Sequence, residues 1–516
     1  MADKQKISLI VREATKEDVA GIEEVYAKVY GQGQPYGPEI LGAQIQNFPE
    51  GQFVAEYNGK IIGYCASIIL PESVVMKPHT WREATNSGYG STHDPDGDYL
   101  YGVEIFIDPT YRNVRIGDRF YRKRKDLCRY LRLKGIVFGG RMSLYSRHQK
   151  KLASPQDYLD QVKEKKIKDP VINFQVRQGF EIIGVLENYY PPDPDSLGYA
   201  AHMIWRNPET EESATPDSRP YKKLSESMVR VATVQYMQRG ISSFVEFEQI
   251  IEYFIDVVAD YRSDFVLFPE LFTLQLLSLE NEQLPADLAI AKLAEHKDAL
   301  DTLFTKLAVS YNVNIVAGSH PTHVDNQIQN VAYIYLRDGS IHAQPKIHPT
   351  PNERFWWNME GGDKVSVIHT DCGPIGVLIC YDAEFPELAR RLVDQGAKIL
   401  FVPFCTDERQ SYMRVRYCCQ ARAVENQVFV AMAGNVGNLP KVHNMDIQYA
   451  QSCILTPCDF CFSRDGIAAD SSPNVEMVSF ADLRLEDLNY ARHQGTVKNL
   501  KDRRHDLYSV VWHKRI

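Results

Sequence analysis

The sequence predicts a two-domain chain of the α/β class, with a mixed α+β domain followed by a layered α/β domain. Its 516 residues exceed the size at which a single hydrophobic core stops growing. A composition break at 206–221, RNPETEESATPDSRPY, contains three prolines and almost no apolar residue, as interdomain linkers do. We therefore expect domains at 1–206 and 222–516, joined by a linker at 207–221.

The first domain is predicted to mix short strands with helices. Asn58-Gly59 lies between two apolar runs and is a strong signal for a tight hairpin. Thr15 and Asp18 suit the beginning of a helix. The predicted elements are a strand at 9–13, a helix ending near 30, hairpin strands at 53–57 and 61–69, a strand at 99–107 and a basic helix at about 114–133.

In the second domain, wholly apolar runs rich in β-branched residues alternate with helical segments. Such strands indicate a sheet that is covered on both faces, which is the pattern of a layered α/β domain. Helices are predicted at 242–260 and 286–310. The predicted buried strands are 229–235, 265–268, 315–318, 331–336, 375–380, 399–403 and 428–433.

Composition and charge argue against several functional classes. The net charge of -9 is unfavourable for a general nucleic-acid binder. No apolar run approaches the length of a membrane span, and residues 1–10 lack the apolar region of a secretory signal. Ten cysteines in such a chain are expected to be reduced thiols in the cytoplasm. The lone CxxC of Cys458 and Cys461 has no partner pair, so we predict no metal site.

Three short motifs place reactive side chains where a predicted strand ends. In the first motif an apolar strand leads to Glu270, in the second Lys346 is followed seven residues later by Glu353, and in the third an apolar strand ends at Cys380. Taken singly, each has an ordinary explanation, since a free cysteine is often only a small buried apolar group. All three at the carboxyl ends of strands, where open α/β sheets place ligand clefts, favour a catalytic site.

Residues from about 229 to 508 resemble the carbon–nitrogen hydrolase (nitrilase) superfamily. The segment 263–270, SDFVLFPE, is similar to that family's glutamate motif, and Lys346 with Glu353 is similar to its lysine motif. Cys380-Tyr381-Asp382 with Phe-Pro-Glu at 385–387 resembles its cysteine motif. The resemblance implies an αββα four-layer sandwich that pairs into homodimers or larger homo-oligomers.

The chemistry of these residue types agrees with the roles that the resemblance implies. A thiol needs a base before it becomes a strong nucleophile, and Glu270 is suited to take the Cys380 proton. Lys346 and the backbone N–H of Tyr381 are expected to stabilise the negative charge that develops on the substrate. Glu353 is expected to orient Lys346 and water. No cofactor is required for this hydrolysis.

The substrate is expected to be a small molecule, either an amide or a nitrile. Cys380-Tyr381-Asp382 resembles the amidase branches, whereas Pro349-Thr350 together with Trp357 is similar to true nitrilases. The amide is favoured and the nitrile is the alternative. Trp357 and Phe404 are candidates for an apolar substrate pocket. A third possibility, a catalytically silent binding protein on the same folds, is disfavoured by the intact Glu, Lys and Cys set.

Residues 7–206 resemble the GNAT acyltransferase fold, from the hairpin at 58–59 to VEIFIDPTYR at 103–112 and FQVRQGF at 174–180. The family's pyrophosphate loop has glycine where Arg115 stands here, and glycine there lets backbone N–H groups approach phosphate. Acetyl-CoA binding is therefore an expectation, with a CoA-sensing or a purely structural domain as alternatives. The candidate acetyl-CoA residues are Phe106, Ile107, Arg112, Arg115, Ile116 and Gly117.

Overall fold

The computed structural model describes residues 8–31, 37–211, 228–280, 284–439, 447–508 and 510–513. The chain divides into two compact units, one within 8–225 and the other formed by 226–516. Most of the predicted linker, from residue 212 on, lies outside the described residues. Asn207, at the start of that linker, is buried, and its Nδ2 atom donates to the carbonyl of Leu133 at 2.9 Å.

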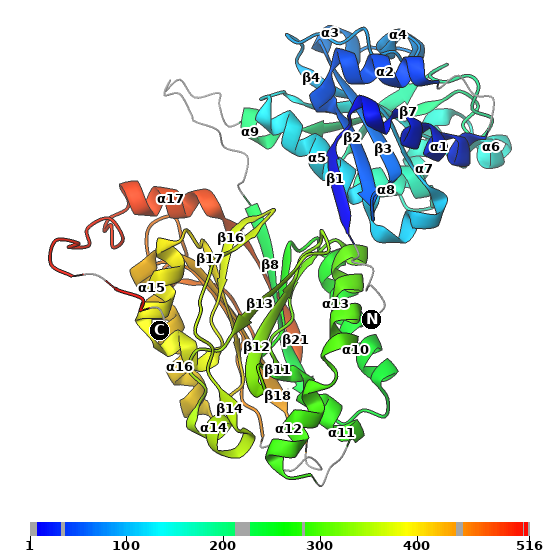
Figure 1. The fold of residues 1–516 in the computed structure, drawn as a ribbon. Helices are drawn as coiled ribbons and strands as arrows, with labels where there is room; N and C mark the ends of the chain where they lie inside the picture. The colour runs from blue at the N-terminus through cyan, green and yellow to red at the C-terminus, as the bar shows by residue number, and fades with distance from the viewer. Residues whose placement is uncertain are drawn as a thin grey trace. The chain divides into compact units, whose positions relative to one another are not determined.

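The first unit is built on a seven-stranded sheet in the order β1-β2-β3-β4-β5-β7-β6, with helices on both faces (Figure 1). Helices α1 and α2 cover one face, and α5, α7 and α8 cover the other. The strands are β1 (Leu9–Glu13), β2 (Gln52–Tyr57), β3 (Lys60–Leu70), β4 (Tyr99–Ile107), β5 (Gly135–Arg141), β6 (Glu181–Leu186) and β7 (Ala200–Arg206). The helices are α1 (Val19–Tyr30), α2 (Pro38–Asn47), α3 (Glu72–Val75), α4 (Trp81–Thr85), α5 (Ile116–Tyr130), α6 (Tyr145–His148), α7 (Pro155–Lys163), α8 (Pro170–Arg177) and α9 (Pro208–Glu211).

Local signals in the sequence account for the start of this unit. Asn58 and Gly59 both adopt positive φ, 49° and 79°, as a two-residue hairpin turn between β2 and β3 requires. Thr15 and Asp18 form a capping box ahead of α1. The predicted strands and helices of this part of the chain are thus confirmed, with α5 shorter at both ends than the basic stretch suggested.

The second unit is a four-layer sandwich of two packed half-sheets between two layers of helices (Figure 1). Helices α10, α12 and α13 cover one half-sheet, and α15 and α16 cover the other. The strands are β8 (Met228–Gln238), β9 (Phe265–Leu267), β10 (Asn314–Val316), β11 (His320–Val324), β12 (Gln327–Tyr335), β13 (Ile341–Pro345), β14 (Met359–Glu360), β15 (Ile368–Thr370), β16 (Gly373–Val377), β17 (Ile399–Phe404), β18 (Phe429–Gly437), β19 (Cys453–Leu455), β20 (Ile467–Asp470) and β21 (Met477–Arg484). The helices are α10 (Phe244–Asp260), α11 (Leu277–Glu280), α12 (Ala286–Ala294), α13 (Lys297–Tyr311), α14 (Pro351–Trp357), α15 (Pro386–Asp394), α16 (Arg409–Asn426) and α17 (Leu485–Gln494).

The core between the half-sheets explains why their strands are apolar on both faces. Phe265 on β9 and Phe401 on β17 face each other, with ring centroids 5.2 Å apart. The half-sheets also join at one edge, where β8 pairs with β18 from Tyr236–Asn435 to Gln238–Gly437. The central strands therefore have a helix layer on one side and the other half-sheet on the opposite side. This is the predicted αββα architecture, and the fold class is confirmed.

One predicted helix is wrong in extent. The segment 286–310 forms two helices, α12 and α13, with a break at Glu295 and His296. The His296 ring stacks on Phe244 of α10 at 5.9 Å, with an interplanar angle of 4°. This contact is made between distant parts of the chain, so the local helical pattern of the segment did not reveal it.

Candidate active site

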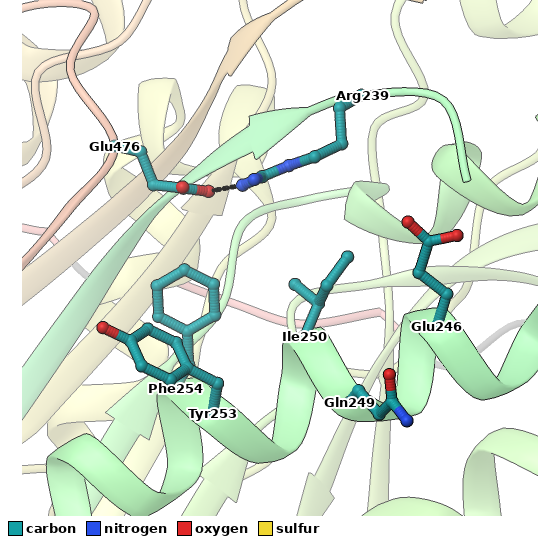
Figure 2. A pocket seen from close by; sticks show the side chains of 7 residues that line it. All are labelled: Arg239, Glu246, Gln249, Ile250, Tyr253, Phe254 and Glu476. Atoms are coloured by element: carbon teal, nitrogen blue, oxygen red, sulfur yellow. Dashed lines mark hydrogen bonds and ion pairs between the residues drawn. The ribbon is translucent and has the colours of Figure 1, made fainter. Parts of the chain in front are cut away.

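A pocket of about 260 Å³ lies against the outer helix α10, beside Arg239, just after β8, and Glu476, just before β21 (Figure 2). Arg239 and Glu476 form an ion pair beside it, and Tyr253 and Phe254 contribute aromatic rings. Among the described residues, its lining offers no thiol, lysine or histidine. The reactive side chains of the second unit instead gather where strands β9, β13 and β16 end.

Cys380 begins a short 3-10 helix just after β16, and its backbone adopts φ 46°. Positive φ is unfavourable for a non-glycine residue and is found at sites where a side chain must be presented in one direction. The side chain is buried, with 5% exposed, and its Sγ atom lies 3.9 Å from the carbonyl oxygen of Cys405. The turn therefore presents a single thiol in a closed, strained position.

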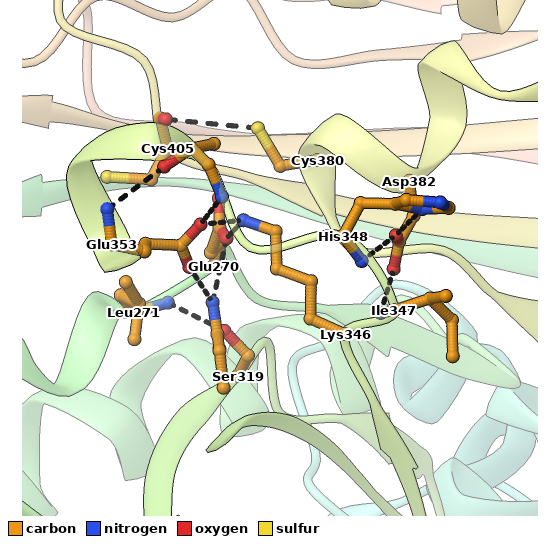
Figure 3. A network of polar contacts seen from close by, with 12 residues as sticks. Glu270, Leu271, Ser319, Lys346, Ile347, His348, Glu353, Cys380, Asp382 and Cys405 are labelled. Carbon is orange, nitrogen blue, oxygen red and sulfur yellow. Dashed lines mark hydrogen bonds and ion pairs between the residues drawn. The ribbon is translucent and has the colours of Figure 1, made fainter. Parts of the chain in front are cut away.

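Two carboxylates share one buried ammonium beside this thiol (Figure 3). The Nζ atom of Lys346 donates to Glu270 Oε1 at 2.7 Å and to Glu353 Oε2 at 2.6 Å. Glu270 follows β9, Lys346 follows β13, and Glu353 lies in the first turn of α14. Figure 3 shows the three side chains converging on one side of Cys380. The structure thus brings together the four residues that the sequence singled out.

The surroundings shift the pKa values of these groups in different directions. Burial raises the pKa of Glu270, and the Lys346 ammonium offsets only part of that shift. Burial also acts on Glu353, but Lys346 and the donors of Thr350 and Asn330 bring the pKa of this carboxyl below its ordinary value. The two carboxylates thus differ: Glu353 is held ionised, while Glu270 binds a proton more readily than an ordinary glutamate does.

Lys346 and the thiol are also affected by burial. Burial lowers the pKa of Lys346, but the charges of Glu270 and Glu353 outweigh it and raise the pKa well above its ordinary value. Burial and the charge of Glu270 raise the pKa of the Cys380 thiol well above its ordinary value. The resting site therefore holds a charged ammonium and a neutral thiol, so the thiol needs a base when it attacks.

Asn330 connects the two carboxylates and was not predicted as a site residue. Its Nδ2 atom, on strand β12, donates to Glu270 Oε1 at 2.9 Å and to Glu353 Oε1 at 2.8 Å. The backbone carbonyl of Glu270 accepts a further hydrogen bond from Asn435 on β18, at 2.7 Å. Asparagine is depleted in strands, but Asn330 follows Gln327 and Gln329 in β12, so the sequence offered little signal for it.

Asp382 holds the loop that follows Lys346 against the turn that carries Cys380. Its carboxylate accepts the backbone N–H of Ile347 at 3.0 Å and that of His348 at 2.8 Å. The His348 Nδ1 atom lies 2.9 Å from the same carboxylate, and its ring stacks on Phe385. Because Asp382 lies two residues after Cys380, it fixes the distance between the thiol and the ammonium.

The turn that carries Glu270 is also strained. Leu271 adopts φ 52° and its N–H donates to Ser319 Oγ at 3.1 Å. Gly318 adopts φ 54°, and a Cβ atom there would lie 1.8 Å from the carbonyl oxygen of Pro269. Only glycine permits this approach of two backbones, so Gly318 sets the position of the glutamate turn.

The candidate substrate-binding residues fall in different environments. Tyr381 is half-buried, with its ring 4.9 Å from Phe385. Trp357 is half-buried at the end of α14 and packs against the apolar core under the helices. Phe404 is fully buried in the core and packs against Tyr412 at 5.8 Å.

In the first unit, the candidate acetyl-CoA residues lie at the end of β4 and the beginning of α5. Phe106 is buried against Tyr26, and Ile107 is the last residue of β4. Arg115 adopts φ 48°, the left-handed conformation that glycine would favour. Ile116 is buried, and a Cβ atom on Gly117 would lie 2.9 Å from Phe174. The Arg112 side chain lies outside the described part of the structure.

Strands β4 and β5 diverge beside these residues. They pair only from Tyr99–Gly135 to Tyr101–Val137, after which β4 continues along β3 and β5 along β7. Such a divergence leaves the far end of β4 without a β5 neighbour in the described residues. It gives the first unit an opening in the sheet next to the N-terminus of α5.

A directed chain of hydrogen bonds lies beside this opening. The His79 Nδ1 atom lies 2.7 Å from the carbonyl of Lys77, which only accepts, so Nδ1 carries the proton. The Nε2 atom then accepts from the Tyr101 hydroxyl at 2.9 Å. Tyr101 in turn accepts from the Tyr189 hydroxyl at 2.8 Å, and Tyr189 accepts from the backbone N–H of Gly139. No pattern in the sequence indicates this chain of hydrogen bonds, because its members lie far apart along the sequence.

The αββα sandwich with a buried glutamate, lysine and cysteine at its strand ends defines a hydrolase of carbon–nitrogen bonds. A family model described as carbon-nitrogen hydrolase matches residues 230–492, and one described as acetyltransferase (GNAT) family matches residues 19–140. The chain therefore belongs to the carbon–nitrogen hydrolase family and carries an N-terminal GNAT-family domain. It is an enzyme, and the predicted fusion of the two families is confirmed.

Three relatives agree with this assignment. "Probable hydrolase YhcX" of Bacillus subtilis is 46% identical over 506 residues, covering 98% of this chain and 98% of that protein. "Uncharacterized N-acetyltransferase YkwB" of the same organism is 33% identical over 204 residues, 39% of this chain and 89% of that protein. "Omega-amidase NIT2" of Xenopus tropicalis is 28% identical over 214 residues, 40% of this chain and 73% of that protein.

Two further features bear on the functional class. Within the described ranges, no three His, Cys, Asp or Glu side chains are grouped so that they could hold a metal ion. No helix in the same ranges is long and apolar enough to cross a membrane.

Proposed function

We propose that the second domain, 222–516, hydrolyses the amide of a small carboxylic acid or carbamoyl compound through a thioester on Cys380. The observation that carries this proposal is the buried set of Glu270, Lys346 and Glu353 beside a thiol on a strained turn. A neutral thiol, a carboxyl of raised pKa and a fixed ammonium are the parts that acyl transfer through cysteine needs.

In the first half-reaction, the Glu270 carboxylate takes the proton of the Cys380 thiol as sulfur attacks the amide carbonyl carbon. The carbonyl electron pair moves to oxygen, where Lys346 and the backbone N–H of Tyr381 stabilise the negative charge. Glu270 then gives its proton to the nitrogen, the C–N bond breaks, and ammonia or an amine leaves. A thioester remains on Cys380.

In the second half-reaction, Glu270 takes a proton from water, whose oxygen attacks the thioester carbon. The C–S bond breaks, the carboxylic acid leaves, and the proton returns to sulfur. Glu353 remains ionised throughout and fixes Lys346 through the 2.6 Å ion pair. Tyr381 and Trp357 are proposed to face the substrate, whereas Phe404 supports the site from the core.

The amide is favoured over the nitrile for two reasons. The residues that follow the nucleophile, Tyr381 and Asp382, resemble the amidase branches, and a relative matched over 73% of its length is named an omega-amidase. The test is ammonia release from matched pairs of small amides and nitriles, with the Cys380→Ala protein as control. Turnover of amides alone, lost in the variant, supports the proposal, and turnover of nitriles alone would replace it with a nitrilase.

We also propose that the N-terminal domain, 1–206, binds acetyl-CoA, which would supply an activated acetyl thioester. The residues fit: β4 diverges from β5 beyond Tyr101, and Arg115 keeps the left-handed backbone at the start of α5 while adding a positive charge. Phe106, Ile107 and the segment 112–117 would hold the cofactor. Isothermal titration with acetyl-CoA tests this, and the absence of binding would leave a structural domain.

A further inference from the structure

Asn330 has an unusual position for an uncharged side chain. It is fully buried within the described residues, and a single amide nitrogen donates both of its hydrogens to two different carboxylates. One hydrogen bond reaches Glu270 and the other reaches Glu353, at 2.9 and 2.8 Å. Hydrogen bonds of this kind, with an ionised acceptor, are stronger than those between neutral groups.

The orientation of this amide is fixed by the charges around it. The Oδ1 atom of Asn330 has no hydrogen-bond partner among the described residues, which is costly for a buried carbonyl. The reverse orientation would place that oxygen against Glu270 and Glu353, where only acceptors face it. The protein therefore leaves one acceptor unsatisfied in order to keep both hydrogens on the two carboxylates.

Of the two carboxylate oxygens of Glu270, only one accepts these hydrogen bonds. Lys346 Nζ and Asn330 Nδ2 both donate to Oε1, at 2.7 and 2.9 Å. Two donors on one carboxylate oxygen fix the rotation of the group and leave Oε2 for another proton. Lys346 alone would not do so, because an ammonium is a point charge that holds the oxygen without fixing the plane of the carboxylate.

We propose that Asn330 is a positioning residue, which holds the Glu270 carboxylate so that Oε2 receives the proton of Cys380. The inference rests on the proposed role of Glu270 as the base. Asn330 touches neither the thiol nor the substrate in this account, and it acts only through Glu270. Its loss should therefore reduce the rate of proton transfer and leave substrate binding unchanged.

The test measures the thiol directly. The probe is methyl methanethiosulfonate, a small neutral reagent whose sulfur is attacked by the thiolate with methanesulfinate as leaving group. The rate of modification at Cys380 is followed by peptide mass spectrometry over a range of pH, in the full-length protein. The variants are Asn330→Ala, Asn330→Asp and Asn330→Ser, the last of which keeps one donor if the alanine protein does not fold.

Asn314 provides a matched control. It is also fully buried in the second unit, at the beginning of β10, and its Nδ2 atom donates to the Asp371 carboxylate at 3.0 Å. The Asn314→Ala protein therefore loses a similar hydrogen bond away from the thiol. It should lose stability without a change in the pH profile of Cys380 modification.

We expect Asn330→Ala to lower the modification rate at neutral pH by about 100-fold, the usual cost of a misplaced catalytic group. Asn330→Asp should in addition shift the profile to higher pH, because a third carboxylate disfavours the ionised base. A profile equal to that of the parent protein, or an equal loss in Asn314→Ala, would overturn the inference.

Amide turnover separates this inference from the proposed function. If Asn330→Ala lowers kcat and leaves KM unchanged, both the proposed hydrolysis and the positioning role of Asn330 are supported. If no amide is hydrolysed by any of the proteins but the thiol profile still depends on Asn330, the proposed hydrolysis fails and the positioning role remains. If the Asn330→Ala protein hydrolyses amides at the same rate as the parent protein, the positioning role is wrong.

Discussion

The Lys346 ammonium and the Glu270 carboxylate form an ion pair that is closed off from solvent. Nζ and Oε1 lie 2.7 Å apart, and the two side chains are 1% and 3% exposed. Glu353 binds the same ammonium, so two negative charges compete for one positive charge. Burial raises the pKa of Glu270, the charge of Glu353 adds to that shift, and the proposed chemistry depends on it.

Replacing Lys346 by methionine should damage both folding and activity. The change leaves two buried carboxylates without their counter-charge, and breaking a buried pair in this way costs roughly 3–5 kcal/mol of stability. Turnover should fall by about 100-fold or more, because a donor to the developing oxyanion is lost. Urea unfolding and ammonia release measure the two effects.

The exposed pair of Lys292, on helix α12, and Glu295, just after that helix, serves as control. Its Lys292→Met variant should unfold like the parent protein, since exposed ion pairs contribute little. A Lys346→Met protein with parental stability would show that the trio of charges does not form as described.

The pH dependence of kcat/KM should follow the ionisation of the Glu270 carboxyl. A general base works in its ionised form, so activity falls as pH drops through the pKa of that group. Because burial raises the pKa of Glu270, the acidic limb should lie above that of an ordinary glutamate, about 4.3. A midpoint at the ordinary value, measured on a small amide, would be inconsistent with a buried base.

Alanine at Gly318 should disturb the glutamate turn. The new Cβ atom would meet the Pro269 carbonyl, and the positive φ adds strain, so a loss of more than about 1 kcal/mol is expected. Gly396→Ala is the matched control, since Gly396 also has positive φ but nothing lies near its Cβ position. Thermal melting should show losses in both proteins, and ammonia release should fall only in Gly318→Ala.

Two neighbouring histidines of the first unit should hold opposite tautomers. His79 places Nδ1 against the carbonyl of Lys77, whereas His202 places Nε2 against the carbonyl of Val75 at 2.9 Å. Burial lowers the pKa of both rings, so both remain neutral at neutral pH. Nitrogen-15 NMR should find the proton on Nδ1 of His79 and on Nε2 of His202. A proton on Nε2 of His79 would disprove the directed chain of hydrogen bonds.

The sequence revealed the residues of the site because the chemistry follows strand ends. Glu270 and Cys380 come a few residues after the apolar strands β9 and β16, and Lys346 comes directly after β13, a strand of mixed polarity. In α/β sheets the ends of strands are where ligand clefts form. The family resemblance then supplied their roles. The αββα architecture was likewise predictable, since strands that are apolar on both faces require cover on both sides.

What the sequence did not reveal depends on contacts between distant segments. Asn330 lies 60 residues from Glu270, and nothing in its own strand indicates that its two hydrogens point to carboxylates. The positive φ of Cys380 arises in the folded turn, and no glycine at this position indicates it in the sequence. Phe404 was predicted to line the pocket because it is aromatic. It lies in the apolar core, where aromatic side chains are equally common.

The proposed hydrolysis depends on a covalent intermediate at Cys380, which acid-quenched peptide mass spectrometry can detect. The full-length protein is mixed with a small amide that it hydrolyses, quenched during turnover, digested and searched for acylated cysteines. An acyl group is expected on Cys380, and the Cys380→Ala protein is expected to show neither an adduct nor turnover. An acyl group on another residue, or ammonia release by Cys380→Ala at the parental rate, would contradict this role of Cys380.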